Sequence, residues 1–326
     1  MNAGKRWWVR LLAGVLLAAP GAPALAQDFP NRPLRIIVPF APGGNVDITA
    51  RAIAGALGDA LGQQVIVDNR AGGGGFIGAT QAAKAAPDGY TLLLGSSGTI
   101  SVAPAVAKVP PYDPVRDLAV IGAIHSVPLV LTSSGKSSIG SYRDLLAQAA
   151  ARPGQVSMAS AGTGTSNHLA IELWMREAKQ KVIHVPYKGA GPALVDLVGG
   201  TVETMIDQLT ASIGHIKDGR IKALAVTSRK RSSLMPDVPT LQELGVSGYD
   251  VTTFTGLFVP AATPRPVVDK LAGALTRALA TPSVRERFAA LGVELIDMDQ
   301  ATFAAYVKRD FDNWRNVARD ANISLD

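Results

Sequence analysis

The chain carries the stretch Arg35-Ile36-Ile37-Val38-Pro39-Phe40-Ala41-Pro42-Gly43-Gly44-Asn45-Val46-Asp47, in which an apolar run leads through a Pro-Gly-Gly turn into helix-forming residues. This order predicts a buried strand, a tight turn and the first turn of a helix. The first backbone N–H groups of a helix have no partner within it, and the helix dipole is positive at that end. Such a place suits a carboxylate or a phosphate. The stretch therefore indicates an anion site at the end of a strand.

Short apolar runs alternate with helical patterns along the rest of the chain. The predicted strands are 34–39, 64–69, 91–95, 129–132, 156–160, 182–185, 205–206, 223–227 and 256–259. The predicted helices are 45–61, 75–85, 141–150, 166–175, 192–199, 266–281, 283–291 and 301–318. Most strand runs are continuously apolar, as expected when helices cover both faces of a sheet. The pattern predicts an α/β fold with mainly parallel sheets.

Two proline-rich segments suggest a division into two lobes. Residues 110–114 break the pattern before a new run of strands, and residues 260–264 precede a run of helices only. We expect a discontinuous first lobe made of 27–126 and 250–326, and a second lobe made of 127–249.

The N-terminus has the features of a secretory signal. Its parts are a basic start at Lys5, Arg6 and Arg10, a short apolar run at 11–19, and the small-x-small pattern Ala24-Leu25-Ala26. We expect a signal peptide at 1–26 and a mature chain that starts near Gln27. An uncleaved signal anchor is the alternative, and the shortness of the apolar run disfavours it.

Composition excludes several classes of protein. The 326-residue chain has no cysteine, which excludes disulfides, thiolate metal ligands and a cysteine nucleophile. The net charge is +6 at pH 7, and the basic residues are scattered apart from Arg229-Lys230-Arg231, which we interpret as a solvated loop. We therefore expect no nucleic-acid partner.

Other glycine-rich or hydroxyl-rich turns follow later strands. They are 70–78, Gly95-Ser96-Ser97-Gly98-Thr99, Ser160-Ala161-Gly162-Thr163-Gly164-Thr165-Ser166-Asn167-His168 and Pro186-Tyr187-Lys188-Gly189-Ala190-Gly191-Pro192. Ligands of α/β proteins bind beyond the carboxyl ends of the strands, where such turns gather. Glycine lets the backbone approach a ligand, and Ser and Thr add short donors. Each turn alone can be a simple connection, but together they predict one shared cleft.

The usual signatures of catalysis and cofactor binding are missing from the sequence. Gly73-x-Gly75-x-x-Gly78 is a nominal dinucleotide fingerprint, but the next strand ends in Gly95-Ser96 instead of the acidic residue that the ribose needs. There is no phosphate loop and no Gly-x-Ser-x-Gly elbow. His125, His168, His184 and His215 are far apart and form no His-Glu-x-x-His zinc pair. We expect no enzyme activity, no cofactor and no metal.

Three polar residues near the turns have a structural interpretation. His168 lies in the first turn of a predicted helix and can be a local cap or donor. His184 lies in a predicted strand, where a buried, hydrogen-bonded imidazole is expected. Asp207 ends an apolar strand. A carboxylate that faces the cleft and a carboxylate with a structural role are two alternatives that both stay open here.

The chain resembles a known family through ordered motifs that cover the whole mature sequence. The motifs are Ile37-Val38-Pro39-Phe40-Ala41-Pro42-Gly43-Gly44-x-x-Asp47, Asn69-Arg70-x-Gly72, Ala86-Pro87-Asp88-Gly89-Tyr90-Thr91-Leu92, Tyr112-Asp113-Pro114, Ser160-Ala161-Gly162-x-Gly164-Thr165-Ser166-x-His168-Leu169, His184-Val185-Pro186-Tyr187-Lys188-Gly189, Ala223-Leu224-Ala225-Val226-Thr227-Ser228 and Pro236-Asp237-Val238-Pro239-Thr240. They are similar to those of the Bug/TctC family, the extracytoplasmic solute-binding proteins of tripartite tricarboxylate transporters.

The resemblance implies a fold and a function. The fold would be the bilobal type II periplasmic-binding-protein fold, or Venus flytrap. The function would be capture of a small carboxylate (a di- or tricarboxylate, an acidic amino acid or an aromatic acid) in the periplasm and its delivery to the membrane subunits of the transporter. We expect a monomer.

The resemblance and the turns together give a set of expected ligand-binding residues. One wall would comprise Phe40, Ala41, Pro42, Gly43, Gly44 and Asp47, and the other Thr163, Gly164, Thr165, Ser166 and His168, with Ser96, Ser97, Gly98, Tyr187 and Asp207 nearby. The family's Phe-Asp-Asn turn reads Ile206-Asp207-Gln208 here, so the distal contacts of the ligand differ from the common pattern. Thr163 and Asn167 vary in the family and are candidates for setting specificity.

Two other functions remain alternatives at this point. One is a receptor that binds the same ligand but signals to a membrane kinase. The other is a periplasmic enzyme acting on a carboxylate, which the missing nucleophile–base pair disfavours.

Overall fold

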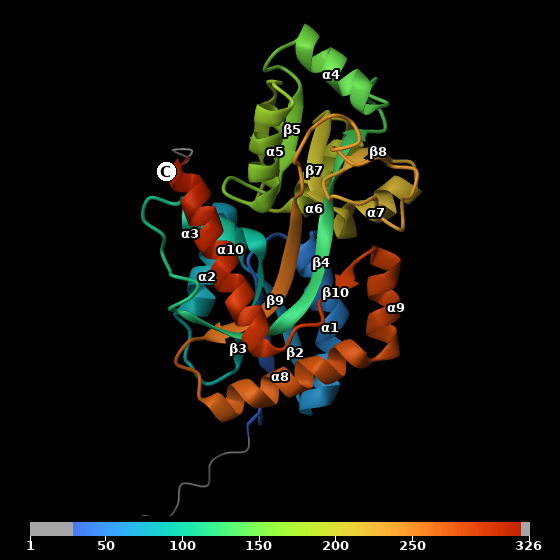
Figure 1. Ribbon diagram of the computed structural model, residues 1–326. Helices are drawn as coiled ribbons and strands as arrows, with labels where there is room; N and C mark the ends of the chain where they lie inside the picture. Colours follow the sequence, from blue (N-terminus) through green and yellow to red (C-terminus); the bar gives the residue numbers. More distant parts are fainter. Residues whose placement is uncertain (1–28, 321–326) are drawn as a thin grey trace, which may run out of the picture.

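The computed structural model describes residues 29–320, with side chains to residue 316 (Figure 1). The expected signal peptide at 1–26 and the mature start near Gln27 lie outside the described residues. A mixed sheet forms the frame, with strand order β2-β1-β3-β9-β4-β7-β5-β6, and β8 and β10 pair with β4.

The lower lobe in Figure 1 is built on β1 (Leu34–Val38), which pairs in parallel with β2 (Val65–Asn69) and β3 (Thr91–Ser96). The other elements of this lobe are α1 (Asn45–Leu61), α2 (Phe76–Ala83), α3 (Ala103–Val106), α8 (Arg265–Ala280), α9 (Pro282–Leu291), β10 (Glu294–Leu295) and α10 (Gln300–Asp320). The predicted strand–turn–helix at residues 34–61 is confirmed.

The upper lobe contains β5 (Ser157–Ser160), parallel to β6 (Ile183–Pro186) and to β7 (Thr204–Gln208), and β8 (Ile221–Val226). Its helices are α4 (Tyr142–Ala151), α5 (Ser166–Glu177), α6 (Ala190–Gly199) and α7 (Leu209–Lys217). The sequence analysis did not predict α3, α7 or β10.

Two long strands connect the lobes. The strand β4 (Leu118–Ser134) pairs antiparallel with β9 (Thr252–Pro260) along its first half and with β7 and β8 along its second half. The expectation of mainly parallel sheets was wrong at these central pairs. The chain leaves one lobe through β4 and returns through β9, so the two strands run side by side in opposite directions.

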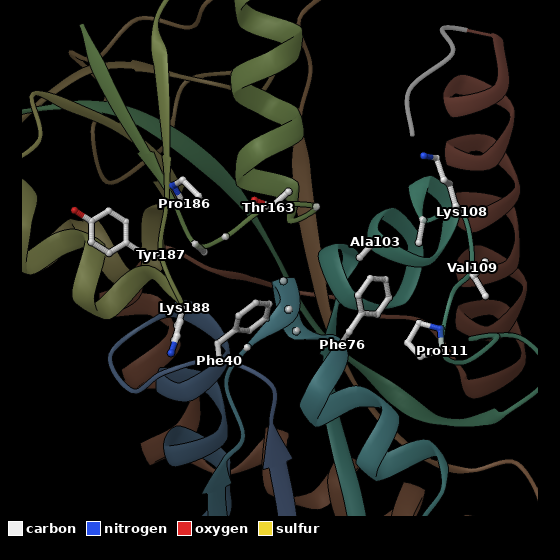
Figure 2. A pocket seen from close by; sticks show the side chains of 18 residues that line it. Phe40, Phe76, Ala103, Lys108, Val109, Pro111, Thr163, Pro186, Tyr187 and Lys188 are labelled. Carbon is white, nitrogen blue, oxygen red and sulfur yellow. The ribbon is translucent and has the colours of Figure 1, made fainter. Parts of the chain in front are cut away.

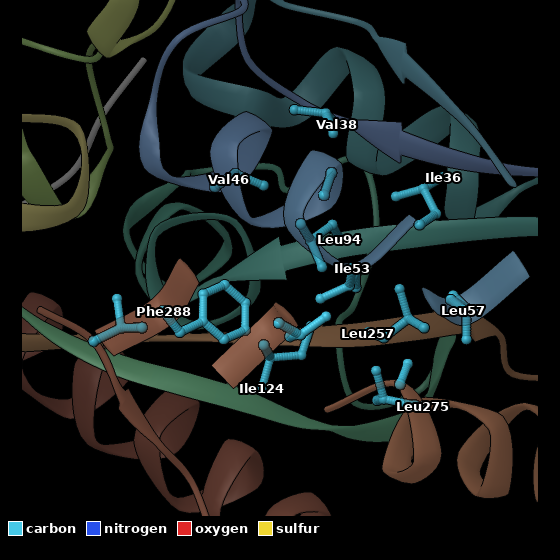
Figure 3. Packing of buried hydrophobic residues seen from close by; sticks show 14 of the residues in the cluster. Ile36, Val38, Val46, Ile53, Leu57, Leu94, Ile124, Leu257, Leu275 and Phe288 are labelled. Atoms are coloured by element: carbon cyan, nitrogen blue, oxygen red, sulfur yellow. The ribbon is translucent and has the colours of Figure 1, made fainter. Parts of the chain in front are cut away.

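Several apolar clusters form the core of the molecule. In the lower lobe, Val46, Ile53 and Leu57 form one face of α1 at helical spacing and pack against strand residues such as Ile36 (Figure 3). In the upper lobe, Trp174 is fully buried in a separate cluster with residues of β4 and α4. The cluster around α1 also includes Leu209 and Ile213 of α7, so it continues from the lower lobe into the upper one.

One face of α10 packs into the core. Phe303, Val307 and Phe311 are buried, and Trp314 packs against a small cluster formed by Val102, Val106 and, from α5, Leu169. This cluster joins residues of both lobes. None of the helices within residues 29–320 is both long and apolar enough to cross a membrane.

Candidate functional site

The expected turns gather around two neighbouring cavities between the lobes, and Figure 2 shows the larger one. The larger cavity has a volume of about 670 Å³. Its lining comes from Phe40, Gly72–Phe76, Ala103, Ala107–Val109, Pro111, Ala161–Gly164 and Pro186–Lys188. Loops of both lobes therefore supply its walls.

A second cavity of about 20 Å³ shares Phe40 and Ala161 with the first and lies between the N-termini of α1 and α5. Its other lining residues are Gly44, Asn45, Val46, Ser96, Gly98, Thr165, Ser166, Asn167, Ala190 and Gln208. Two helix N-termini thus direct unpaired N–H groups and positive dipole ends at one small space. Neither cavity is lined by a described Asp or Glu side chain.

Two polar atoms beside the small cavity have no protein partner. They are the Ser166 Oγ and the Asn45 Oδ1, on residues that are 5% and 3% exposed. An unpaired buried polar group costs free energy, so native proteins rarely leave one without a partner. The two atoms therefore mark a place where a ligand or an ordered water completes the hydrogen bonding.

The turn before α1 is fixed by the Asp47 carboxylate. Asp47 Oδ2 accepts from the Gly43 N–H at 3.0 Å, and Asp47 Oδ1 accepts from Asn69 Nδ2 at 3.0 Å. Arg51 forms an ion pair with the same carboxylate at 3.0 Å. Burial alone would raise the pKa of Asp47, but the hydrogen bonds from Arg51, Gly43 and Asn69 hold it below its usual value. Asp47 therefore stays ionised. It holds the turn in position without lining either cavity.

The turn before α5 is fixed by neutral groups. The Thr165 hydroxyl donates to the Gly162 carbonyl at 2.7 Å and accepts from the His168 N–H at 3.3 Å. His168 Nδ1 accepts from the Gly164 N–H at 3.2 Å. Since a backbone N–H can only donate, His168 Nδ1 carries no proton in this arrangement.

A second imidazole supports the first. The rings of His168 and His184 stack with centroids 4.0 Å apart, and His184 Nε2 is hydrogen-bonded to Ser160 Oγ at 2.6 Å. Burial, together with the neighbouring His168, lowers the pKa of His184 to about 4. His184 is therefore uncharged at neutral pH, and its ring packs against the His168 ring that holds the turn.

The two lobes touch next to the cavities. The Ala41 N–H donates to the Lys188 carbonyl at 3.0 Å. A Cβ added to Gly191 would lie 1.9 Å from the Pro42 carbonyl oxygen, and one added to Gly74 would lie 2.2 Å from the Thr163 carbonyl oxygen. Only glycine permits these approaches, so the structure is a closed arrangement of the lobes.

The structure brings many of the expected site residues to the cavities. Phe40, Thr163, Gly164 and Tyr187 line the larger one, and Phe40, Gly44, Ser96, Gly98, Thr165 and Ser166 line the smaller one. The others lie behind the walls: Ala41, Pro42 and Gly43 meet the opposite lobe, Asp47 and His168 brace the turns, and Ser97 Oγ accepts from the Phe254 N–H at 2.9 Å.

Asp207 lies behind the small cavity. It is fully buried, Oδ1 accepts from Asn167 Nδ2 at 3.0 Å, and Oδ2 accepts from Ser212 Oγ at 3.2 Å. Burial raises the pKa of Asp207 to about 7, against the hydrogen bonds that favour its charged form. Asn167 and Gln208, which line the cavity, stand in front of it. In this arrangement Asp207 orients Asn167.

Sequence reasoning missed part of the lining. Phe76 lies within the recognised turn at 70–78 but was not named as a ligand contact, Pro111 belongs to the segment 110–114 that had been interpreted only as a lobe boundary, and Val109 directly precedes that segment. An apolar residue at the end of a binding turn is a usable signal for Phe76. The described residues contain no group of three His, Asp or Glu side chains that could hold a metal ion.

Comparison with known proteins identifies the family. The family described as "Tripartite tricarboxylate transporter family receptor" (TctC) matches residues 49–323. BugT of Bordetella pertussis is 38% identical over 321 residues, which cover 97% of this chain and 98% of BugT. The structure of the periplasmic binding protein BugD matches with a TM-score of 0.87 at 37% identity, covering 91% of this chain and 99% of BugD.

Two further solved structures hold ligands. MatC from Rhodopseudomonas palustris with bound malate has a TM-score of 0.84 at 34% identity, covering 89% of this chain and 99% of MatC. An R. palustris protein with adipate has a TM-score of 0.86 at 33% identity, covering 91% of this chain and 99% of that chain. The family and fold expected from the motifs are confirmed. The chain belongs to the TctC family of tripartite tricarboxylate transporter receptors and has the bilobal fold of periplasmic binding proteins.

Proposed function

We propose that this protein is a periplasmic receptor that captures a small carboxylate between its lobes and delivers it to the membrane subunits of a tripartite tricarboxylate transporter. The observation that carries the proposal is the small cavity between two helix N-termini, with the unpartnered Ser166 Oγ beside it. The carboxylates in the two ligand-bound relatives agree with this choice of ligand. The signal at 1–26 would place the mature protein in the periplasm.

The carboxylate would occupy the small cavity. Its partners would be the N–H groups at the starts of α1 and α5, the hydroxyls of Ser96 and Ser166, and ordered water. Hydrogen bonds to a charged group contribute about 1.5–3 kcal/mol each. Four to six of them give roughly 6–18 kcal/mol before ordering costs, and micromolar affinity needs about 8 kcal/mol. The site therefore needs no arginine.

Closure of the lobes would couple capture to delivery. The proposed lobes are 27–126 with 250–326, and 127–249, with hinges in β4 and β9. Closure removes water from the ligand and presents a new combined surface to the membrane subunits. Equal interlobe distances in solution scattering with and without ligand would contradict this part of the proposal.

The test is a thermal-shift screen of carboxylates, amino acids, sugars and cations on the purified mature protein, followed by calorimetry. We expect a carboxylate to raise the melting temperature and Ser166→Ala to weaken its binding. Ser138→Ala is the matched control, since Ser138 is exposed and lines neither cavity. Stabilisation by a sugar or a cation, with no response to any carboxylate, would overturn the proposal.

A further inference from the structure

A small apolar cluster joins the two lobes without lining either cavity. Val102, Val106 and Leu169 are buried in it, and Trp314 of α10 packs against them. Val102 and Val106 belong to the lower lobe, whereas Leu169 belongs to α5 of the upper lobe. We call these four residues the interlobe cluster.

The lower-lobe part of the interlobe cluster is the back of a cavity wall. A π-helical turn that ends at Val102 runs directly into α3, so Val102 and Val106 are about one helical turn apart. Ala103 and Ala107, each the next residue along, line the larger cavity. One side of this segment therefore faces the cavity, and the neighbouring side packs against Trp314 of α10, which lies beside α3 in Figure 1.

The upper-lobe part of the cluster lies at the start of α5, next to the small cavity. Leu169 is in the first turn of this helix, together with Ser166, which lines that cavity. A Cβ added to Gly98 would lie 3.3 Å from the Ser166 nitrogen, so the lower lobe also meets the start of α5 here. A movement that separates the lobes at this point would pull Leu169 away from Val102 and Val106 as well.

Separation of the interlobe cluster would expose apolar surface. In the closed arrangement the exposed fraction is 0% for Val102, 2% for Val106 and 6% for Leu169. Removal of apolar surface from water stabilises the arrangement that buries it. This stabilisation needs no ligand, because all of the contacting atoms belong to the chain itself. The interlobe cluster therefore favours closed lobes before any carboxylate binds.

We propose that Leu169 and Trp314 are positioning residues of the receptor. Through the interlobe cluster they hold the start of α5 against the lower lobe and keep closed lobes populated in the ligand-free protein. This inference rests on the lobe closure of the proposed function and holds for whichever carboxylate binds. Closed lobes that exist before binding raise the apparent affinity, because less of the binding free energy is used for closure.

The test measures the distance between the lobes in the ligand-free protein. The chain has no cysteine, so Gln81→Cys and Glu177→Cys, at exposed positions of α2 and α5, place two spin labels and no others. The mature protein is unfolded and refolded to remove bound ligand, and pulsed electron–electron double resonance gives the ratio of closed to open molecules. We expect the labelled wild type to contain molecules with the interlobe distance of the closed arrangement.

The substitution Leu169→Ala in the labelled protein is expected to lower the closed-to-open ratio about tenfold, which corresponds to about 1.4 kcal/mol. Leu173→Ala is the matched control, because Leu173 lies on the same helix but packs against the upper-lobe cluster around Trp174. We expect this control to lower the melting temperature and to leave the closed-to-open ratio unchanged.

A second variant, Trp314→Ala, guards against a folding defect in Leu169→Ala. Trp314 is only partly buried and lies near the end of α10, so its truncation keeps the fold and lowers the ratio about threefold. Equal ratios in the wild type and both cluster variants overturn the inference, and so do an equal effect of Leu173→Ala and a wild type without closed molecules. The proposed function is tested separately, since the carboxylate screen uses the unlabelled wild type.

Discussion

The turns before α1 and α5 face the same small cavity from opposite lobes, yet different chemistry fixes each one. The first turn is fixed by a charge, because the Asp47 carboxylate accepts from the Gly43 N–H and pairs with Arg51. The second is fixed by neutral groups, because the Thr165 hydroxyl and the His168 imidazole hold the backbone of the turn. Both arrangements leave the N–H groups at the helix start directed at the cavity.

The difference teaches that the two walls of one site respond to different conditions. A proton on His168 Nδ1 would face the Gly164 N–H, so the second wall depends on a neutral imidazole. The first wall keeps its charge until the solution is acidic enough to protonate Asp47, whose pKa is held low. The first wall therefore depends on an ionised carboxylate, and the second depends on an unprotonated ring nitrogen.

The largest effect is expected at the charged turn. Asp47→Ala removes the acceptor of the Gly43 N–H and leaves Arg51 and Asn69 without their shared partner. We expect a loss of about 2–3 kcal/mol in the free energy of unfolding, together with weaker carboxylate binding, because buried donors lose their partner. Urea unfolding and calorimetry measure the two effects. Asp59→Ala, on the exposed face of the same helix, is the control and changes neither.

The second prediction concerns the turn before α5, where we expect the free energy of unfolding to depend on pH. The pKa of His184 is about 4 in the folded protein and about 6.5 when unfolded. Between these pH values the unfolded chain binds more protons than the folded protein does. The contribution of neutral His184 to the free energy of unfolding is therefore fully present above pH 6.5 and is lost as the pH falls towards 4. We expect wild type to lose about 1–2 kcal/mol more than His184→Gln over this range, after allowance for solvent screening.

The comparison between variants is needed because the buried His125 shifts in the same direction. Equal pH profiles for wild type and His184→Gln would show that the imidazole pair does not support the second turn. Ligand affinity measured over the same range follows the stability of that turn, while the charged turn stays intact down to lower pH.

A third prediction concerns the contact that brings the two walls together. Gly191→Ala places a Cβ against the Pro42 carbonyl, so closure is hindered and carboxylate affinity falls at least tenfold, about 1.4 kcal/mol. The lobe itself is not destabilised, because alanine is the better helix former. Gly199→Ala in the same helix is the control, since its Cβ would meet nothing nearer than Thr201 Oγ1 at 3.7 Å. Unchanged affinity in Gly191→Ala would mean that the bound state is more open.

The smallest effect separates helix capping from ligand binding. Thr165→Val and Ser141→Ala each remove a side-chain cap, from α5 and α4, and each is expected to cost about 1 kcal/mol of stability. Only Thr165 borders the cavity, so only Thr165→Val also weakens carboxylate binding. Calorimetry on the two variants checks this prediction. Equal carboxylate affinities of the two variants would mean that Thr165 acts only as a helix cap.

Local patterns predicted the turns that border the cavities. The turns at residues 41–47 and 160–168 were predicted because each is a strand, a glycine turn and a helix start that are adjacent in the chain. The helix at residues 45–61 was predicted with its observed bounds, because its apolar spacing and the turn before it agree. The strand β4 was predicted only at 129–132, since Gly122 and Pro128 interrupt its pattern, whereas pairing with β9 keeps Leu118–Ser134 extended.

The sequence by itself determined the family, the α/β class and the helix N-termini that suit an anion, because each depends on neighbouring residues. Only the tertiary structure decided the antiparallel pairing of β4 with β9, the position of Asp207 behind Asn167, and the meeting of Phe40 with Phe76 across the glycine segment. These features join residues far apart in the chain, and their contacts follow from how the two lobes pack.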